Sequence, residues 1–185
     1  MWALSTSGGA KAAYHHGDLR RSLLAAARAL LDRGGPDAVT LREAARAAGV
    51  SHNAPYRHFP SRDALLAAVA TEGFLALRAR LAAAREAAPP AGRLVAIGRA
   101  YLGFAAQERA AFRLMFGGAL DLAAHAELRE AAEAAFTVLR DTVAEGADAA
   151  SVEGATVRAW GLVHGLATLV ADRQITPEAA EAGLA

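Results

Sequence analysis

The stretch 39-VTLREAARAAGVSHNAPYRHFPSRDALL-66 decides how this sequence is interpreted. Thr40 precedes an Ala-rich run at 41–48 and has Glu43 three residues further on, which is the spacing of a capping box at a helix N-terminus. Gly49 follows the run and supplies the positive φ that a tight turn between helices favours. The stretch therefore predicts a short helix at 41–48 that ends in a tight turn.

A second short helix is expected at 51–59, with Ser51 as its N-cap. Pro55 stands inside this segment, although a proline in a helix interior costs about 3 kcal/mol. Because Pro55 falls in the first turn after Ser51, we expect a smaller cost, with the turn tightening into a 3₁₀ turn to absorb the ring. The pair of short helices has the size of a DNA-binding helix-turn-helix.

The second segment is crowded with hydroxyl, amide and cationic side chains that a short helix does not need for folding. Base edges and phosphates in a DNA major groove are contacted by these side-chain types. The apolar Pro55 ring could meet a thymine methyl group. The polar side chains concerned are Ser51, His52, Asn53, Arg57 and His58.

Apolar residues recur at helical spacing through most of the remaining chain, and β-branched and aromatic residues are few. Gly34-Gly35-Pro36, Gly117-Gly118 and the prolines at 89 and 90 separate the periodic segments. The sequence therefore predicts an all-α protein, in which a long helix joins a small head to a larger bundle. Helices are expected at 18–33, 61–86, 93–107, 108–120 with a glycine break, 125–146 and 152–174, with a short turn after Thr176-Pro177.

Composition excludes several classes of protein. The chain has 185 residues and no cysteine, which rules out disulfides and thiolate catalysis and fits a reducing cytoplasm. The N-terminus lacks the apolar core of a signal peptide, and the late apolar run at 157–171 is shorter than the roughly 20 residues of a membrane span. We therefore expect a soluble, cytoplasmic protein that does not interact with a membrane.

Charge is unevenly divided along the chain. Residues 1–63 hold nine Lys and Arg against five Asp and Glu, whereas residues 64–185 hold eleven against fourteen. A basic head on an acidic body suggests that the head meets an anionic partner. No nucleophile–base pair, phosphate-binding glycine loop or metal-ligand spacing is visible, so no enzyme activity, cofactor or metal is predicted.

Residues 14–66 resemble the N-terminal DNA-binding domain of the TetR family of bacterial transcriptional repressors. The resemblance is carried by 39-VTLREAARAAGVS-51, 56-YRHF-59 and 60-PSRDALL-66, with Arg62 where the family usually has Lys. It implies that Tyr56 reaches a phosphate and that Thr40 and Arg62 hold backbone phosphates. His58 and Phe59 are expected to pack inward, His58 with its hydrogen bonds satisfied. The residues expected at DNA are Thr40, Ser51, His52, Asn53, Ala54, Pro55, Tyr56, Arg57 and Arg62.

The segment 158-RAWGLVHGLATL-169 resembles the Trp-x-x-x-His-Gly segment of one subgroup of TetR-like C-terminal domains. This implies a helical domain that binds a small molecule and dimerises. We expect a mainly apolar ligand with a hydrogen bond from a tyrosine or histidine, although aromatic and Met side chains at helical spacing are more often core than pocket. The candidates are Tyr101, Phe104, Phe112, Met115, Phe116, Leu120, His125, Trp160 and His164.

Dimerisation is expected through the helices at about 125–146 and 152–174. Both offer small residues at helical spacing, which let helices approach closely. Packing inside one chain would use the same faces, and the family resemblance favours the dimer. The small residues are Ala131, Ala135, Gly154, Gly161, Gly165 and Thr168.

The sequence thus predicts a disordered tail at 1–13, a helix-turn-helix domain at 14–62 and a ligand-binding and dimerisation domain at 63–185. The predicted function is a homodimeric repressor of a palindromic operator, released by an unknown small effector. A helical carrier or enzyme with an incidental basic head is the alternative. Steep salt dependence of DNA affinity would separate the two.

Overall fold

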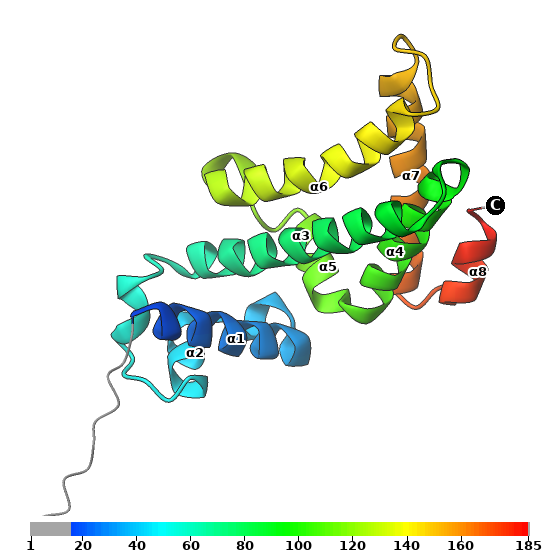
Figure 1. Cartoon of the computed structure of the whole chain (residues 1–185). Coiled ribbons are helices and arrows are strands. Elements are labelled where there is room, and N and C mark those ends of the chain that lie inside the picture. Colours follow the sequence, from blue (N-terminus) through cyan, green and yellow to red (C-terminus); the bar gives the residue numbers. More distant parts are fainter. Residues whose placement is uncertain (1–15, 185) are drawn as a thin grey trace, which may run out of the picture.

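The computed structural model describes residues 16–184, so the tail predicted at 1–13 lies outside the described residues. Over the described residues the chain forms α-helices and short 3₁₀ helices without strands, which confirms the all-α prediction (Figure 1). The α-helices are α1 (His16–Gly34), α2 (Leu41–Ala47), α3 (Arg62–Ala87), α4 (Arg93–Gln107), α5 (Arg109–Phe116), α6 (Ala126–Ala144), α7 (Val152–Ala171) and α8 (Pro177–Ala182). The 3₁₀ helices are η1 (Pro36–Ala38), η2 (Ala54–Arg57), η3 (Pro90–Gly92) and η4 (Leu122–Ala124).

The long helix α3 organises the molecule. The Ser61 hydroxyl caps it by accepting a hydrogen bond from the Ala64 N–H at 3.0 Å, as the sequence predicts. Helix α3 packs against α1 at one end and against α4, α5 and α6 along its length (Figure 1). Gly73 permits the close approach of α5, because a Cβ there would lie 2.6 Å from the Met115 sulfur.

The head consists of α1, η1, α2 and η2. The apolar stripe predicted on the first helix is buried at every position, namely Leu19, Leu23, Ala27, Leu30 and Leu31. Helix α1 packs on both α2 and α3, and Phe59 closes this core with 2 % of its surface exposed. The Arg20 guanidinium lies 5.6 Å from the centre of the Phe59 ring, in cation–π contact.

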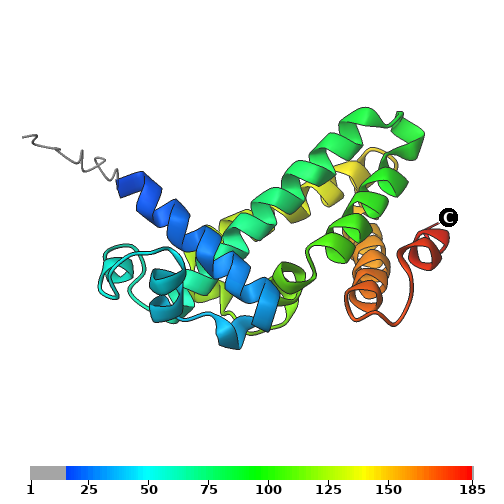
Figure 2. The same cartoon turned by 90° about the horizontal axis from the view of Figure 1, so that it is seen from below.

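The body consists of α3 to α8. Helix α4 lies along α7, and α8 packs against both at the end of the molecule far from the head (Figures 1 and 2). The Thr176 hydroxyl caps α8 by accepting from the Ala179 N–H, as the sequence predicts.

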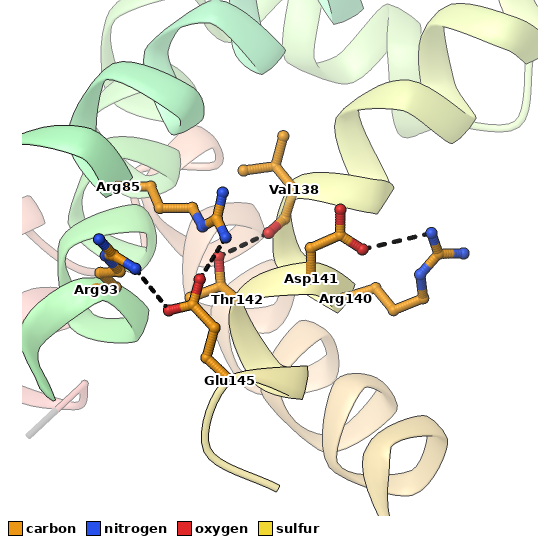
Figure 3. A network of polar contacts seen from close by, with 7 residues as sticks. All are labelled: Arg85, Arg93, Val138, Arg140, Asp141, Thr142 and Glu145. Carbon is orange, nitrogen blue, oxygen red and sulfur yellow. Dashed lines mark hydrogen bonds and ion pairs between the residues drawn. The ribbon is translucent and has the colours of Figure 1, made fainter. Parts of the chain in front are cut away.

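An ion-pair cluster fixes the long helices at the end of α3 that lies far from the head. Arg85 near the end of α3 and Arg93 at the start of α4 both hydrogen-bond to the Glu145 carboxylate, which follows α6 (Figure 3). The Arg93 contact measures 2.9 Å. The hydrogen bond from Arg93, and to a smaller extent the one from Arg85, holds the pKa of the Glu145 carboxyl below its usual value. The cluster therefore ties the α3–α4 turn to the end of α6.

The α-helix predicted at 51–59 is wrong. The chain makes a turn in which the Ala54 N–H donates to the Ser51 carbonyl at 3.0 Å, and only the 3₁₀ helix η2 follows. Pro55 occupies the second position of η2, where its missing N–H leaves no helical hydrogen bond unmade. Ser51 consequently caps no helix.

Candidate nucleic-acid interface and ligand cavity

The turn between α2 and η2 positions the exposed segment of the head. The Thr40 hydroxyl caps α2 by accepting from the Glu43 N–H at 3.1 Å. At the other end, the Val50 N–H donates to Ala45 and the Gly49 N–H donates to Arg46, which is a Schellman motif. Gly49 has a φ of 69°, which favours glycine.

The capping box is only half formed. The Glu43 carboxylate accepts from Arg46 Nε at 3.0 Å instead of returning to the Thr40 N–H. That hydrogen bond holds the pKa of Glu43 below its usual value. Glu43 therefore neutralises Arg46. The exposed side chains of Arg42 and Arg57 form no ion pair with any described residue.

Five of the nine side chains predicted at DNA are exposed on one short segment: Ser51, His52, Asn53, Tyr56 and Arg57. Tyr56 exposes 60 % of its surface, more than any other large apolar or aromatic side chain among the described residues. An aromatic side chain this open has a hydroxyl free to bind a phosphate.

Pro55 and Ala54 differ from expectation. Pro55 is fully buried and Ala54 is half-buried against the core, so the Pro55 ring is not available to meet a thymine methyl group. The physical reason is the 3₁₀ geometry, which turns Pro55 inward while Tyr56 and Arg57 face outward. The predicted base contact by Pro55 is therefore wrong.

Arg62 has a structural role that the sequence did not indicate. Its guanidinium donates to the Val39 carbonyl at 2.8 Å and to the Pro36 carbonyl at 2.6 Å, and lies 3.6 Å from Asp37. Arg62 thus fixes the loop that precedes α2 and with it the position of Thr40. A phosphate contact by Arg62 stays a prediction.

His58 and Phe59 turn inward to different extents. Phe59 is buried, as expected, and His58 is half-buried at a ring distance of 6.4 Å from Phe59. The Nε2 atom of His58 is buried without a hydrogen-bond partner among the described residues. The expectation of a satisfied histidine is therefore not met.

The body encloses a cavity of about 590 Å³ between α3, α4, α5, α6 and α7. Five of the nine predicted ligand residues line it: Tyr101, Met115, Phe116, Leu120 and Trp160. Aromatic rings pack edge-on around it, with Phe74 and Phe116 centred 5.2 Å apart and Phe136 and Trp160 5.8 Å apart. Volume and lining fall within the range of small-molecule sites.

The other four predicted residues do not line the cavity. Phe104 is core and lies under the Arg80 guanidinium at 5.4 Å, and His125 precedes α6. Phe112 and His164 lie outside the cavity lining, where each contacts the ring of Phe116, a lining residue.

The sequence did not predict that α3 lines the cavity, which it does through Phe74, Leu77 and Leu81. Their spacing predicted a buried helix face, but nothing in the sequence showed that the face meets a void.

A hydrogen bond joins the cavity wall to the layer behind it. The Tyr101 hydroxyl lies 2.9 Å from His164 Nδ1. Burial raises the pKa of the Tyr101 hydroxyl, and the nearby Trp160 side chain offsets this in part. Burial lowers the pKa of His164, so its imidazole is neutral at pH 7.

A second polar link connects the body to the head. Glu108, at the junction of α4 and α5, hydrogen-bonds to Arg28 of α1 and lies 3.5 Å from Arg80 of α3. Because α3, α4 and α5 all line the cavity, Glu108 joins the cavity walls to the first helix of the head.

The outer face of α7 carries an exposed stripe of small and apolar residues. Gly154, Val157, Gly161, Gly165 and Thr168 are all exposed. A Cβ on Gly161 or Gly165 would meet nothing within 4 Å, so packing inside the chain does not require these glycines. Ala131 and Ala135 of α6, by contrast, are buried within the chain, which corrects their expected place on an outer face.

The sequence matches two family models. The one described as "Bacterial regulatory proteins, tetR family" matches residues 23–69, and the one described as "Tetracyclin repressor-like, C-terminal domain" matches residues 94–184. The chain belongs to the TetR family. As a TetR-family protein it is a DNA-binding transcriptional regulator with a helical C-terminal domain. Membership of the Trp-His-Gly subgroup stays a prediction.

Solved structures share this fold. A protein of unknown function from Rhodococcus sp. RHA1 is 36 % identical, with a TM-score of 0.81 over 94 % of this chain and 93 % of that chain. A tetR-family regulatory protein from Rhodococcus RHA1 is 23 % identical, with a TM-score of 0.65 over 90 % and 96 %. FadR from Bacillus subtilis, solved with stearoyl-CoA, is 15 % identical, with a TM-score of 0.73 over 89 % and 95 %. No curated protein matches the chain.

Residues 16–184 hold neither a candidate metal site nor a membrane-spanning helix. No group of three or more His, Asp or Glu side chains there could hold a metal ion. None of the helices over the same range is both long and apolar enough to cross a membrane.

Proposed function

We propose that this TetR-family regulator acts in the cytoplasm as a homodimeric repressor of a palindromic operator, and that a small lipophilic effector in the body releases it. The observation that carries the proposal is the exposed segment 51–57, where Tyr56 is open to solvent at the end of a rigidly capped turn. A carrier or an enzyme would have no use for this surface.

Selection of bound DNA from a random pool tests the proposal most directly. We expect a recovered palindrome whose half-sites are about 34–36 Å apart, one turn of the double helix. Recovery of no sequence, at low salt and without ligand, would contradict it.

Arg57 gives a sharper test of the DNA-contacting segment. Arg57→Ala should weaken operator binding by about 1–3 kcal/mol if a base contact is lost, or lower the salt slope by about 1 if a phosphate contact is lost. Arg78→Ala is the matched control, because Arg78 is exposed on α3 within the body. Equal effects of the two substitutions in a gel-shift titration would argue against segment 51–57.

The proposed dimer uses the outer face of α7. A glycine inside a helix costs about 1 kcal/mol relative to alanine, so Gly161 and Gly165 are explained if a second copy packs closely there. Gly161→Leu should shift sedimentation toward the monomer, whereas Ala79→Leu, which enlarges an exposed position on α3, should not. An unchanged dimer in the Gly161→Leu variant would place the interface elsewhere.

The proposed effector site is the cavity of the body. FadR from Bacillus subtilis shares this fold and was solved with stearoyl-CoA, which supports a ligand within such a bundle. The walls of the cavity meet the Arg28–Glu108 link to the head, which gives a bound molecule a route to alter the position of segment 51–57.

A further inference from the structure

The charge of the cavity wall restricts its ligand. Among the described residues that line the cavity there is no Lys, Arg or His, and the one carboxylate is that of Glu133. Glu133 is exposed and lies 3.3 Å from Arg129, in an ion pair of its own. A negatively charged group would therefore meet no counter-ion inside the cavity, and burying an unpaired charge is costly.

The rim of the cavity gives an anion no better place. Leu94, Leu122, Phe136, Trp160 and Leu162 line the cavity and are exposed to solvent, so its opening is apolar. Among the described lining residues, Glu133 is again the one charged side chain there, and it offers a carboxylate no counter-ion.

Among the described residues that line the cavity, Tyr101 is the buried one with a polar side chain, and its O–H is already used. The neutral imidazole of His164 has one acceptor nitrogen, and Tyr101 donates to Nδ1 at 2.9 Å in the arrangement that leaves no buried O–H unmatched. What remains toward the cavity is a lone pair on the Tyr101 oxygen, which accepts a hydrogen bond.

We propose that the effector is an uncharged lipophilic molecule with a hydroxyl group, which donates a hydrogen bond to Tyr101, and that the cavity discriminates against carboxylates. This inference rests on the proposed function, because it assigns a ligand class to the proposed effector site. Tyr101 is then the residue that determines specificity.

A set of decyl compounds that differ only in the head group tests both the hydrogen bond to Tyr101 and the discrimination against charged ligands. The probes are 1-decanol, decyl methyl ether, decanoate and decyltrimethylammonium, each titrated into the full chain without DNA. Calorimetry or the fluorescence of Trp160 reports binding, in a Trp2→Phe background because Trp2 is the other tryptophan of the chain and would add its own fluorescence. We expect decanol to bind roughly tenfold or more tightly than decanoate, and several-fold more tightly than its ether.

Tyr101→Phe separates the hydrogen bond from the shape of the cavity. In this variant the advantage of decanol over the ether should fall to about one, even if both bind more weakly because the wall has loosened. Thr71→Val is the matched control, because it removes a hydroxyl that donates to the Ala67 carbonyl within α3 and does not line the cavity, so all four affinities should stay unchanged.

Each alternative result has a defined meaning. Decanoate or decyltrimethylammonium binding as tightly as decanol overturns the uncharged class, and an ether equal to decanol overturns the hydrogen bond. Failure of every decyl compound to bind overturns the ligand class. A palindrome recovered by DNA selection would still support the proposed regulatory function in that case.

Discussion

At the scale of single residues, the same side chains serve both folding and binding in the head. Thr40 caps α2 and is also predicted to hold a phosphate, and Arg62 anchors the loop before it through two backbone carbonyls. Pro55 shows how local backbone geometry decides whether a residue contacts DNA or packs in the core. The sequence identified it as the unusual residue of the segment, but the 3₁₀ helix turned its ring into the core.

Thr40→Ala should lower both stability and DNA affinity. Losing the cap costs about 1 kcal/mol in the free energy of unfolding, and the phosphate contact is lost with the hydroxyl. Thr176→Ala removes an equivalent cap from α8 in the body and should reduce stability alone. Urea denaturation and operator titration measure the two effects, and a Thr40→Ala variant with unchanged DNA affinity would limit Thr40 to capping.

At the scale of elements, helices with strong periodicity and clear caps could be predicted from sequence to within a few residues. Helix α3 begins after its Ser61 cap, and α8 after Thr176, as expected. The conformation of segment 51–59 could not be predicted in this way. Its polar composition indicates a contact surface but does not distinguish an α-helix from a 3₁₀ helix. The α3 wall of the cavity was also missed, because a buried helix face looks the same in sequence whether it meets side chains or a void.

The Glu145 cluster gives a prediction that depends on pH. The folded protein holds the pKa of Glu145 low, so the ionised form stabilises the fold above the ordinary Glu pKa of about 4.3, and this contribution is lost as pH falls through the folded pKa. Glu145→Gln should lower the melting temperature at pH 7 by roughly 1–3 °C, since exposed ion pairs contribute little.

The difference between Glu145→Gln and the parent should narrow as the pH falls below the ordinary Glu pKa and through the lowered pKa of the folded protein, because the parent carboxylate then becomes neutral as well. Glu86→Gln is the control, because Glu86 is exposed on α3 without an ion pair among the described residues. A calorimetric difference that stays constant across this pH range would assign the effect to packing instead of charge.

At the scale of the whole molecule, a regulator must connect two sites in different parts of the chain. The cavity could be anticipated from the scarce aromatics that gather at 101–116, but its connection to the head depends on contacts between residues far apart in sequence. Arg28 and Glu108 illustrate this, because they belong to α1 and to the α4–α5 junction and no local pattern links them. Helices α4 and α5 both line the cavity, so a ligand that moves either one displaces Glu108.

Glu108→Gln should therefore weaken the coupling between effector and operator more than it weakens either binding event. Coupling between two sites is reciprocal, with typical energies of about 1–3 kcal/mol. In the parent, operator DNA should weaken 1-decanol binding by the same factor by which decanol weakens operator binding. In Glu108→Gln this factor should move toward one, because the Arg28 contact loses its charge while the side chain keeps its shape.

The matched control is Asp172→Asn, which removes the 2.8 Å ion pair between Arg113 of α5 and Asp172 after α7, a contact within the body. The coupling factor should stay at its parental value in this variant. Operator titrations with and without decanol give the factor directly. If Glu108→Gln keeps the parental factor, or Asp172→Asn loses it to the same degree, the signal does not pass through Arg28 and Glu108, and α3, which packs on both α1 and the cavity, becomes the route to test next.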